Sequence, residues 1–308
     1  MQKRKEAWAR LSIASNSLLV VLKVVVGALT GSVSIVAEGL HSGVDLAASL
    51  ITYVSVRISG KEADRDHHYG HGKFENIAGV IEGLLIFLGA GVIIWEALPK
   101  LFSGKGPETI GWGIAVMAVS SAVNFLVSAK LFKIATATGS PALEADAWHL
   151  RTDVYTSLGV LAGFALIKIT GINLFDPLVA LVVAGFIMKA AYGITKEGFA
   201  HMVDVALPED EMRAVHAAIA RHGEHFIDFH ELRARKSGSQ RFIDLHLVMP
   251  RALPLEQAHR LCDIIEKEIE SYLPDSHVLI HAEPCERGCA ECGRSGGKKT
   301  GPCLEPEP

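Results

Sequence analysis

Long apolar stretches alternate with short polar segments over the first two-thirds of this chain of 308 residues. Each stretch is close to the ~20 residues that an α-helix needs to cross a bilayer. Some contain charged residues, such as Lys23 and Glu82, and ionisable groups at membrane depth usually serve a function. The pattern predicts six transmembrane helices, over 9–30, 33–57, 77–98, 110–133, 145–169 and 177–196.

The pattern changes near residue 204, where shorter amphipathic segments begin. A period of 3.6 residues predicts two helices, over 208–223 and 254–272. Alternation of apolar and polar residues predicts three strands, over 226–236, 240–249 and 276–282. The resulting order, α-β-β-α-β, is that of a small α+β domain of the ferredoxin-like type.

The chain is therefore expected to have three parts. A six-helix transmembrane domain over 1–203 precedes a cytoplasmic α+β domain over 204–286. Residues 287–308 are rich in Gly, Pro, Lys and Glu, which predicts a disordered tail.

Composition agrees with a membrane protein. Hydrophobic residues make up 49% of the chain and the mean hydropathy is +0.29, both high for a soluble protein. The net charge of -4 and the lack of a basic domain argue against a nucleic-acid partner. Lys and Arg are more frequent at the N-terminus and in the second and fourth loops than in the first loop, which places both termini in the cytoplasm. The basic N-terminus carries no signal-peptide cleavage motif, so the first helix is expected to stay in the mature protein.

An internal repeat carries the most informative chemistry. Residues 37–50 and 145–158 share the pattern A-[ED]-x-x-H-x-x-x-D-x-x-x-S-L, with a constant offset of 108 residues. One copy lies on the second predicted membrane helix and the other on the fifth, and these two helices are expected to run antiparallel. Inverted repeats of this kind place the substrate site of many transporters near the bilayer midplane.

The repeat brings together a set of metal ligands. A His and an Asp four residues apart lie on one face of a helix, so the two copies offer His41, Asp45, His149 and Asp153. Two imidazoles and two carboxylates can complete the tetrahedron that Zn²⁺ prefers, with no position left for a hydrolytic water. Metal binding requires deprotonated ligands, so protons compete with the metal near neutral pH. We therefore expect an antiporter that exchanges Zn²⁺ for protons, and not an enzyme.

The acidic residues one turn before each His allow two interpretations of their role. Glu38 and Asp146 either contact the ligands or are solvated near the helix ends.

Two other groups of potential ligands lie outside the membrane helices. The second loop contains Asp64, His67 and His71, a density that favours metal capture over a merely solvated loop. The second domain contains His230, His246, His281 and Glu283 on or beside its strands. Spacing alone favours a structural role for these, because isolated histidines on strands are more often structural than ligating.

The C-terminal end holds four cysteines: Cys285, Cys289, Cys292 and Cys303. Four thiolates can hold Zn²⁺ or Cu⁺. A loose tail with incidental cysteines is the favoured reading, because the last spacing is long and nothing near it in the sequence would pack against it.

These motifs resemble those of the cation diffusion facilitator family, especially its YiiP-like branch of bacterial zinc transporters. The resemblance covers about residues 8–286 and rests on the paired helical ligands, the HYGHGKFE loop, the ADAWHLRTDVYTS segment and the Asp176-Pro177 start of the sixth helix. It implies a homodimer in the bacterial cytoplasmic membrane, with a cytoplasmic metallochaperone-like domain on each subunit.

The resemblance also implies roles for individual residues. The transport site would be His41, Asp45, His149 and Asp153, and the loop site Asp64, His67 and His71. A zinc cluster at the dimer interface would contain His230, His246, His281 and Glu283, with His259 joining it. Lys73 and Asp204 would form a charged pair that locks the two membrane domains together.

Two residues depart from the YiiP-like pattern. His41 stands where an Asp is usual, which within the family resembles a preference for Zn²⁺ over Cd²⁺. Glu283 stands where an Asp is usual, and its longer side chain still offers a carboxylate ligand.

Other functions remain open at this stage. An exporter of Fe²⁺, Co²⁺ or Mn²⁺ would use the same fold, although imidazole ligands disfavour Mn²⁺. A membrane-bound metal sensor would leave the ligand pairs in the membrane without a task. A membrane metalloprotease is disfavoured because the chain has no H-E-x-x-H motif.

Overall fold

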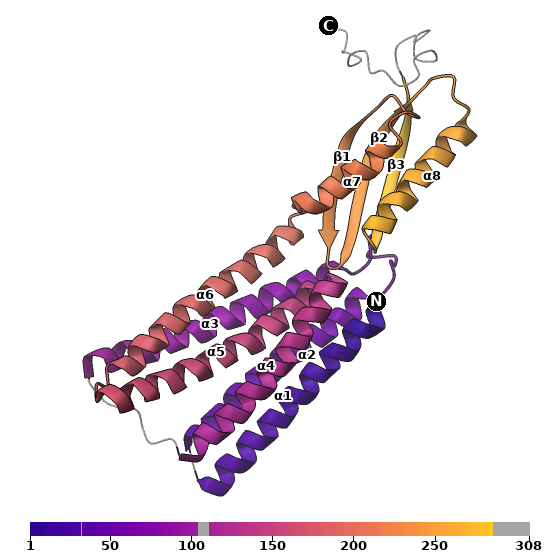
Figure 1. The fold of residues 1–308 in the computed structure, drawn as a ribbon. Helices are drawn as coiled ribbons and strands as arrows, with labels where there is room; N and C mark the ends of the chain where they lie inside the picture. Colours follow the sequence, from indigo (N-terminus) through magenta and orange to yellow (C-terminus); the bar gives the residue numbers. More distant parts are fainter. Residues whose placement is uncertain (32, 104–110, 286–308) are drawn as a thin grey trace. The chain divides into compact units, whose positions relative to one another are not determined.

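The computed structural model describes residues 1–31, 33–103 and 111–285 (Figure 1). The chain divides into two compact units, Met1–Val203 and a second unit that begins at Asp204.

The described residues of the first unit form six long helices. Five of the predicted stretches fall within one of them, and the stretch 110–133 does so from residue 111 onward, since residue 110 lies outside the described residues. The helices are α1 (Gln2–Thr30), α2 (Val33–Ser59), α3 (Lys73–Ser103), α4 (Gly111–Thr138), α5 (Pro141–Thr170) and α6 (Phe175–Met202). At 1.5 Å per residue, a helix of 28 residues is ~42 Å long and exceeds the ~30 Å hydrocarbon core of a bilayer. This is why the helices extend past the apolar stretches at their ends.

Five of these helices are long and apolar enough to span a membrane when the described residues are considered: α1, α3, α4, α5 and α6. The remaining helix, α2, has 27 residues and is the one that bears the ligand motif with Glu38, His41 and Asp45. It packs against α1, α3 and α5 within the unit.

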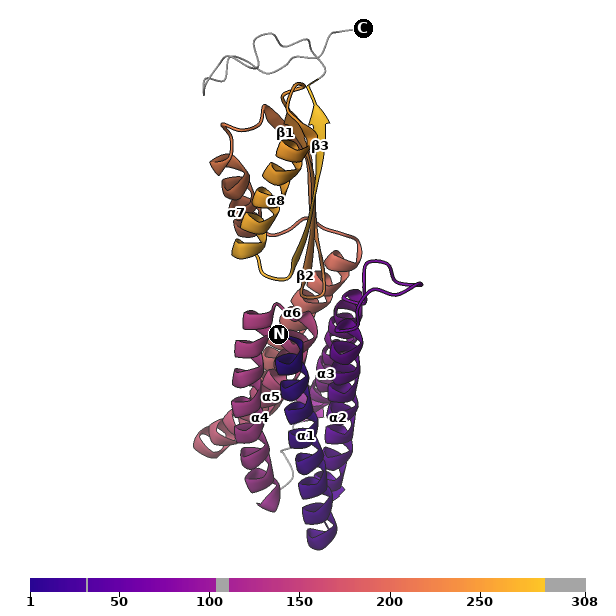
Figure 2. The ribbon, with the colours of Figure 1, turned by 90° about the vertical axis from the view of Figure 1, so that its right-hand side faces the viewer.

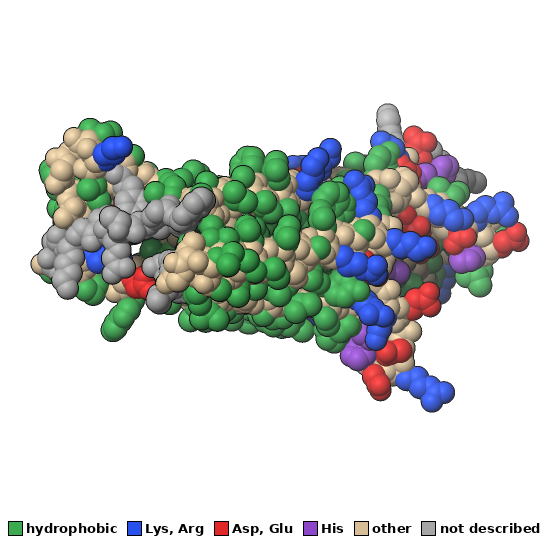
Figure 3. Space-filling model, turned by 90° about the horizontal axis from the view of Figure 1, so that it is seen from below, with side chains coloured by type: hydrophobic (Ala, Val, Ile, Leu, Met, Phe, Trp, Pro, Cys, Tyr) green, Lys and Arg blue, Asp and Glu red, His purple; other side chains and the backbone are tan. Residues whose placement is uncertain are grey.

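The outer surface of the first unit suits contact with lipid. Hydrophobic side chains cover the helices on the face seen in Figure 3, and large ones such as Leu18, Leu88 and Phe186 are well exposed. Between the helices, small buried residues such as Ala78 and Ala147 allow close approach.

One end of the bundle is tied by a buried charge network. Lys5 Nζ on α1 donates to Glu75 Oε1 on α3 at 2.6 Å, and both side chains are buried. Ser59 of α2 donates to the same carboxylate at 2.6 Å, and Ser140 also donates to it. Three other segments of the chain therefore contact the carboxylate of Glu75.

Ser140 also explains where α5 begins. Its hydroxyl accepts from the backbone N–H of Leu143, and Pro141 occupies the first turn. The helix therefore starts four residues before the predicted apolar stretch, because the N-cap is a polar feature that the hydropathy pattern does not indicate.

The second unit has the predicted α-β-β-α-β order. Its elements are α7 (Glu209–Arg221), β1 (Asp228–Ser237), β2 (Gln240–Met249), α8 (Leu255–Tyr272) and β3 (Ser276–Pro284). The sheet order is β1-β2-β3, with β1 and β2 antiparallel and β2 and β3 parallel. Both helices cover one face of the sheet (Figure 2), where alternate residues of β2 (Ile243, Leu245 and Leu247) are fully buried. The ferredoxin-like α+β prediction is confirmed.

A bidentate ion pair joins α7 to the sheet. Arg241 donates through Nε and Nη2 to the two carboxylate oxygens of Glu211, at 2.7 and 2.9 Å. Lys236 Nζ lies 2.8 Å from the same carboxylate. Burial opposes ionisation of Glu211, but these hydrogen bonds and positive charges outweigh it and lower its pKa to about 2.

Replacing Glu211 with Gln should destabilise the second unit by about 1–2 kcal/mol at neutral pH, a value reduced for solvent screening. Because the pKa of Glu211 is lowered on folding, its contribution is complete above its unfolded pKa of about 4.5 and is lost as pH falls to about 2. Hydrogen–deuterium exchange of β1 and β2 in the full-length protein checks this. Faster exchange is expected in the variant at pH 7, and equal rates there would contradict the assignment.

Candidate metal centre

The two copies of the repeat meet inside the first unit. His149 Nε2 on α5 lies 3.1 Å from Asp45 Oδ1 on α2. His41 Nε2 lies 4.0 Å from the same oxygen. Ligand atoms of His41, Asp45 and Asp153 lie within 4.8 Å of one another. The four side chains predicted from the repeat thus lie together, with the other three around Asp45.

The contacts between these helices show that they run antiparallel. Asp45 pairs with His149, whereas Ser49, one turn later on α2, donates to Asp146, nearly one turn earlier on α5, at 3.2 Å. The opposite directions of α2 and α5 can be followed in Figure 1. The two repeat copies are therefore related by an inversion of chain direction, as the spacing predicts.

Burial differs sharply among the four candidates. Asp45 and His149 are buried, whereas the side chain of His41 is 58% exposed. A further polar layer lies one turn from Asp45, where Asn16 donates to Ser49 at 2.6 Å and Ser12 shares a hydrogen bond with Ser49 at 3.1 Å. Ser12, Asn16 and Ser49 are all buried, so this layer closes the site on one side while His41 leaves it open on another.

Two residues that contact the ligands were not identified as site residues from the sequence. Glu82 Oε2 on α3 lies 3.2 Å from His149 Nδ1. Asn124 on α4 donates to Asp153 Oδ2 at 3.3 Å. Glu82 was visible as a carboxylate inside an apolar stretch. Nothing in the spacing connects Asn124 to the repeat.

The residues one turn before each His have different surroundings. Glu38 accepts from Lys23 Nζ at 3.1 Å and is partly exposed. Lys23 also donates to Ser42 at 2.8 Å. Asp146 is buried and accepts from Ser49. Asp146 is therefore part of the closed polar layer, whereas Glu38 pairs with a lysine of α1.

The loop between α2 and α3 forms a second cluster. Asp64 Oδ1 lies 3.2 Å from His67 Nδ1, and Asp64 Oδ2 lies 3.3 Å from His71 Nε2. The backbone N–H of His67 donates to Asp64 at 2.8 Å and, with that of Asp66, holds the pKa of the carboxyl below its usual range. The three side chains can hold one metal ion.

The sheet of the second unit carries a third cluster. His230, His246 and His281 face one another across β1, β2 and β3. Glu283 Oε1 lies 2.6 Å from His246 Nδ1, and Glu283 Oε2 lies 3.1 Å from His230 Nε2. Although desolvation opposes it, these imidazoles lower the pKa of Glu283. Ligand atoms of His230, His246 and Glu283 lie within 4.8 Å of one another, and the ring of His281 lies 4.9 Å from that of His246. The register thus gathers histidines that looked scattered in the sequence.

Other predicted residues lie elsewhere. His259 is exposed on α8, with Nδ1 3.7 Å from Asp263. Lys73 Nζ donates to the carbonyl of Met202 at 3.2 Å, and Asp204 accepts from Arg235 at 3.2 Å. Cys285 is buried at the end of β3, and its backbone N–H donates to the carbonyl of Met249 at 3.0 Å. The other predicted tail ligands, Cys289, Cys292 and Cys303, lie outside the described residues.

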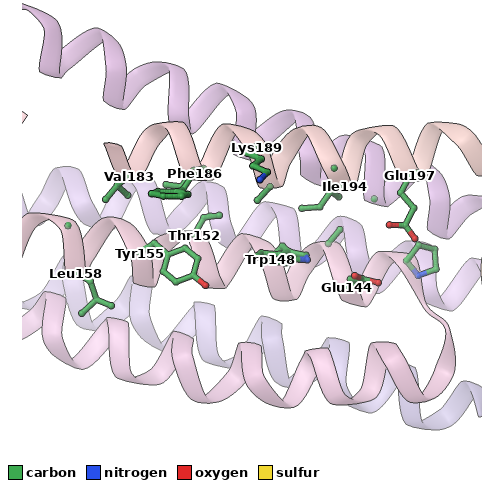
Figure 4. A pocket seen from close by; sticks show the side chains of 18 of the residues that line it. Glu144, Trp148, Thr152, Tyr155, Leu158, Val183, Phe186, Lys189, Ile194 and Glu197 are labelled. Carbon is green, nitrogen blue, oxygen red and sulfur yellow. The ribbon is translucent and has the colours of Figure 1, made fainter. Parts of the chain in front are cut away.

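A separate cavity of about 800 Å³ lies between α5 and α6. Trp148 and Tyr155 of α5 and Phe186 and Lys189 of α6 point into it (Figure 4). Its lining is mainly apolar, and none of the four ligand candidates of the repeat lines it. We assign this cavity no part in cation binding.

Comparison with known proteins agrees with both units. The family described as "Cation efflux transmembrane domain" matches residues 9–203, and "Cation efflux protein, cytoplasmic domain" matches residues 207–285. The chain is 33% identical to the uncharacterized transporter sll1263 of Synechocystis over 91% of this chain and 90% of that protein. It is 36% identical to the cation-efflux pump FieF of Serratia proteamaculans over 90% and 92% of the two chains. A solved structure of CzrB, a candidate zinc transporter, shares 32% identity over 26% of this chain and 99% of that chain, with a TM-score of 0.25.

The family matches together span nearly the whole chain, and the relatives align over most of their own length. The helical unit is therefore an integral membrane domain that moves divalent cations. The chain belongs to the cation diffusion facilitator family of cation-efflux transporters.

Proposed function

We propose that this transporter exports Zn²⁺ from the cytoplasm in exchange for protons, by alternating access to one site between α2 and α5. The supporting observation is the convergence of His41, His149 and Asp153 on Asp45. This convergence assembles two imidazoles and two carboxylates inside a membrane domain.

The donor set favours zinc. Imidazole nitrogen and carboxylate oxygen are both common Zn²⁺ ligands, and four of them satisfy its tetrahedral preference without a bound water. Mn²⁺ and Mg²⁺ favour a larger number of oxygen ligands. Fe²⁺ and Co²⁺ accept the same donors and are the alternative cargoes.

The same donors account for coupling to protons. Each imidazole and carboxylate must be deprotonated to bind a metal ion. When the site opens to a compartment where protons compete with the metal, protonation of the ligands releases the cation. The protonated site then opens again to the cytoplasmic side. His41 is the most exposed of the four ligand candidates.

The loop charges support an orientation. The excess of Lys and Arg at the N-terminus and in the second and fourth loops favours a cytoplasmic position for them and for the second unit. Since the named relatives are bacterial, we place the protein in the cytoplasmic membrane of a bacterium.

Zinc uptake into proteoliposomes tests this function. In vesicles that contain the wild-type protein and carry a pH gradient, Zn²⁺ should accumulate on the acidic side. The pH gradient should dissipate as zinc moves. Co²⁺ and Fe²⁺ supplied separately report cargo preference. Zinc flux that neither responds to the gradient nor moves protons would contradict antiport.

We also propose that the clusters outside the membrane bind zinc. Asp64, His67 and His71 would capture it at the loop. The histidine row on β1, β2 and β3, with Glu283, would bind it at the interface of a homodimer, with His259 of α8 contributing there. Lys73 and Asp204 would form a charged pair that joins the membrane domains of the dimer.

Zinc on the sheet cluster should regulate transport. Changing both His230 and His246 to Ala should leave the membrane site intact but remove activation by cytoplasmic zinc, because binding there biases the dimer between its states. The rate of zinc uptake against zinc concentration measures this, with His225→Ala, elsewhere in the second unit, as control. Identical zinc dependence in the double variant and the wild type would refute regulation.

A further inference from the structure

The position of Glu82 is unusual for a membrane helix. This carboxylate lies on α3 and is fully buried. Its Oε1 accepts from Thr52 Oγ1 on α2 at 3.0 Å, and its Oε2 lies 3.2 Å from His149 Nδ1 on α5. A buried carboxylate at membrane depth is unfavourable unless its surroundings and its task compensate. Its contact with an imidazole that faces the cation site indicates what that task is.

His149 has a carboxylate at each ring nitrogen. Nε2 lies 3.1 Å from Asp45 Oδ1, inside the candidate metal centre, and Nδ1 lies 3.2 Å from Glu82 Oε2, outside it. A neutral imidazole carries one N–H, and the nitrogen that binds a metal must have a free lone pair. Nε2 shares a hydrogen bond with Asp45, so a cation that binds Nε2 must displace that bond and leave the N–H on Nδ1. The carboxylate of Glu82 is the acceptor that lies beside Nδ1 for this proton.

The other imidazole of the site is held differently. His41 is the counterpart of His149 in the repeat, but its side chain is 58% exposed. Within the described part of the chain, its carboxylate contact is Asp45 at 4.0 Å, which is itself a ligand candidate. The two repeat copies are therefore unequal. The imidazole of His149 is held at its far nitrogen by Glu82, whereas that of His41 is able to move.

We propose that Glu82 is a positioning residue for the transport site. Its carboxylate fixes the tautomer and the ring orientation of His149, so that Nε2 is already aimed at the incoming cation. Thr52 holds Glu82 in place through the other carboxylate oxygen. His41 then closes on the cation from the exposed side. This inference rests on the proposed function, because it assumes that His149 binds the cargo.

Zinc uptake by Glu82 variants in proteoliposomes tests the proposal. Glu82→Met removes the acceptor, and the apparent KM for Zn²⁺ should rise by about 10- to 100-fold, the range seen when a partner of a metal-bound His is lost. Glu82→Gln keeps a carbonyl acceptor without the charge and should give an intermediate KM. The kcat per folded transporter should change far less than KM in both variants. Glu96→Gln changes an exposed carboxylate on the same helix and should leave both constants unchanged.

The outcomes separate a positioning role from a structural one. A fall in kcat with KM within about twofold of wild type in both variants would mean that Glu82 only supports the fold, and the proposal would be wrong. If Glu82→Met does not fold, Glu82→Gln alone decides by the same criterion. His149→Ala separates this inference from the proposed function. Unchanged transport in that variant refutes the function itself, whereas lost transport together with a normal KM in the Glu82 variants refutes only the role of Glu82.

Discussion

Replacing Asp45 with Ala should lower zinc transport by about 100-fold or more, because every other ligand candidate is arranged around this carboxylate. One of its oxygens lies 3.1 Å from His149 and 4.0 Å from His41. Loss of a residue that merely orients a metal ligand lowers affinity or activity by about 10- to 100-fold, so loss of the shared ligand should reach or exceed the upper end. Initial rates of zinc uptake into proteoliposomes measure the effect.

The variant should still fold, because His149 keeps a second buried carboxylate, Glu82, 3.2 Å from its other ring nitrogen, and Asp153 loses a neighbour of like charge. Monodisperse elution from a sizing column would confirm this. Asp210→Ala, an exposed carboxylate on α7, is the matched control and should transport at the wild-type rate. If Asp45→Ala kept more than about half of the wild-type rate, the site between α2 and α5 would not be the transport site.

The second large effect concerns stability. Replacing Lys5 with Met should destabilise the membrane unit by about 3 kcal/mol, because Glu75 would remain buried without the ammonium group 2.6 Å away. Ser59 and Ser140 would still donate to the carboxylate but would not neutralise it. Thermal unfolding in detergent should show a midpoint lower by roughly 6–12 °C.

A control on the same helix separates burial from charge. Arg10 pairs with Glu6 at 3.4 Å, but its side chain is 63% exposed, so Arg10→Met should change stability by less than about 1 kcal/mol. The double variant Lys5→Met, Glu75→Leu should recover most of the loss, because an apolar pair of similar volume replaces the ions. Equal midpoints for Lys5→Met and wild type would show that the network does not support the bundle.

The sequence was most informative where its spacing carried geometry. A His and an Asp four residues apart must share a helix face, so the repeat alone predicted that α2 and α5 carry matched ligand pairs. Their approach to one another, with Asp45 beside His149, depends on packing that also involves α1 and α3. The contributions of Glu82 and Asn124 come from helices outside the repeat, and no periodicity links them to it.

In the second unit, the sequence placed the histidines on strands but not beside one another. Their alignment depends on the β1–β2 register, which includes an irregularity between His230 and Arg233. One of the two residues within it, Glu231, has a φ of 50°, an uncommon conformation for a residue other than Gly. Such a feature follows from strand pairing and could not be predicted from alternation. The strand limits themselves were predicted to within two residues.

X-ray absorption at the zinc edge tests most directly whether the membrane helices hold the cation. The protein should carry Ala at Asp64, His67 and His71 in the loop, at His230, His246, His281 and Glu283 in the second unit, and at the four tail cysteines. We predict one Zn²⁺ per chain, bound by four nitrogen and oxygen ligands at about 2.0–2.2 Å, and its loss when Asp153 is also changed to Ala. Zinc that is absent from the first variant, or that stays bound after the Asp153 change, would contradict a transport site built from His41, Asp45, His149 and Asp153.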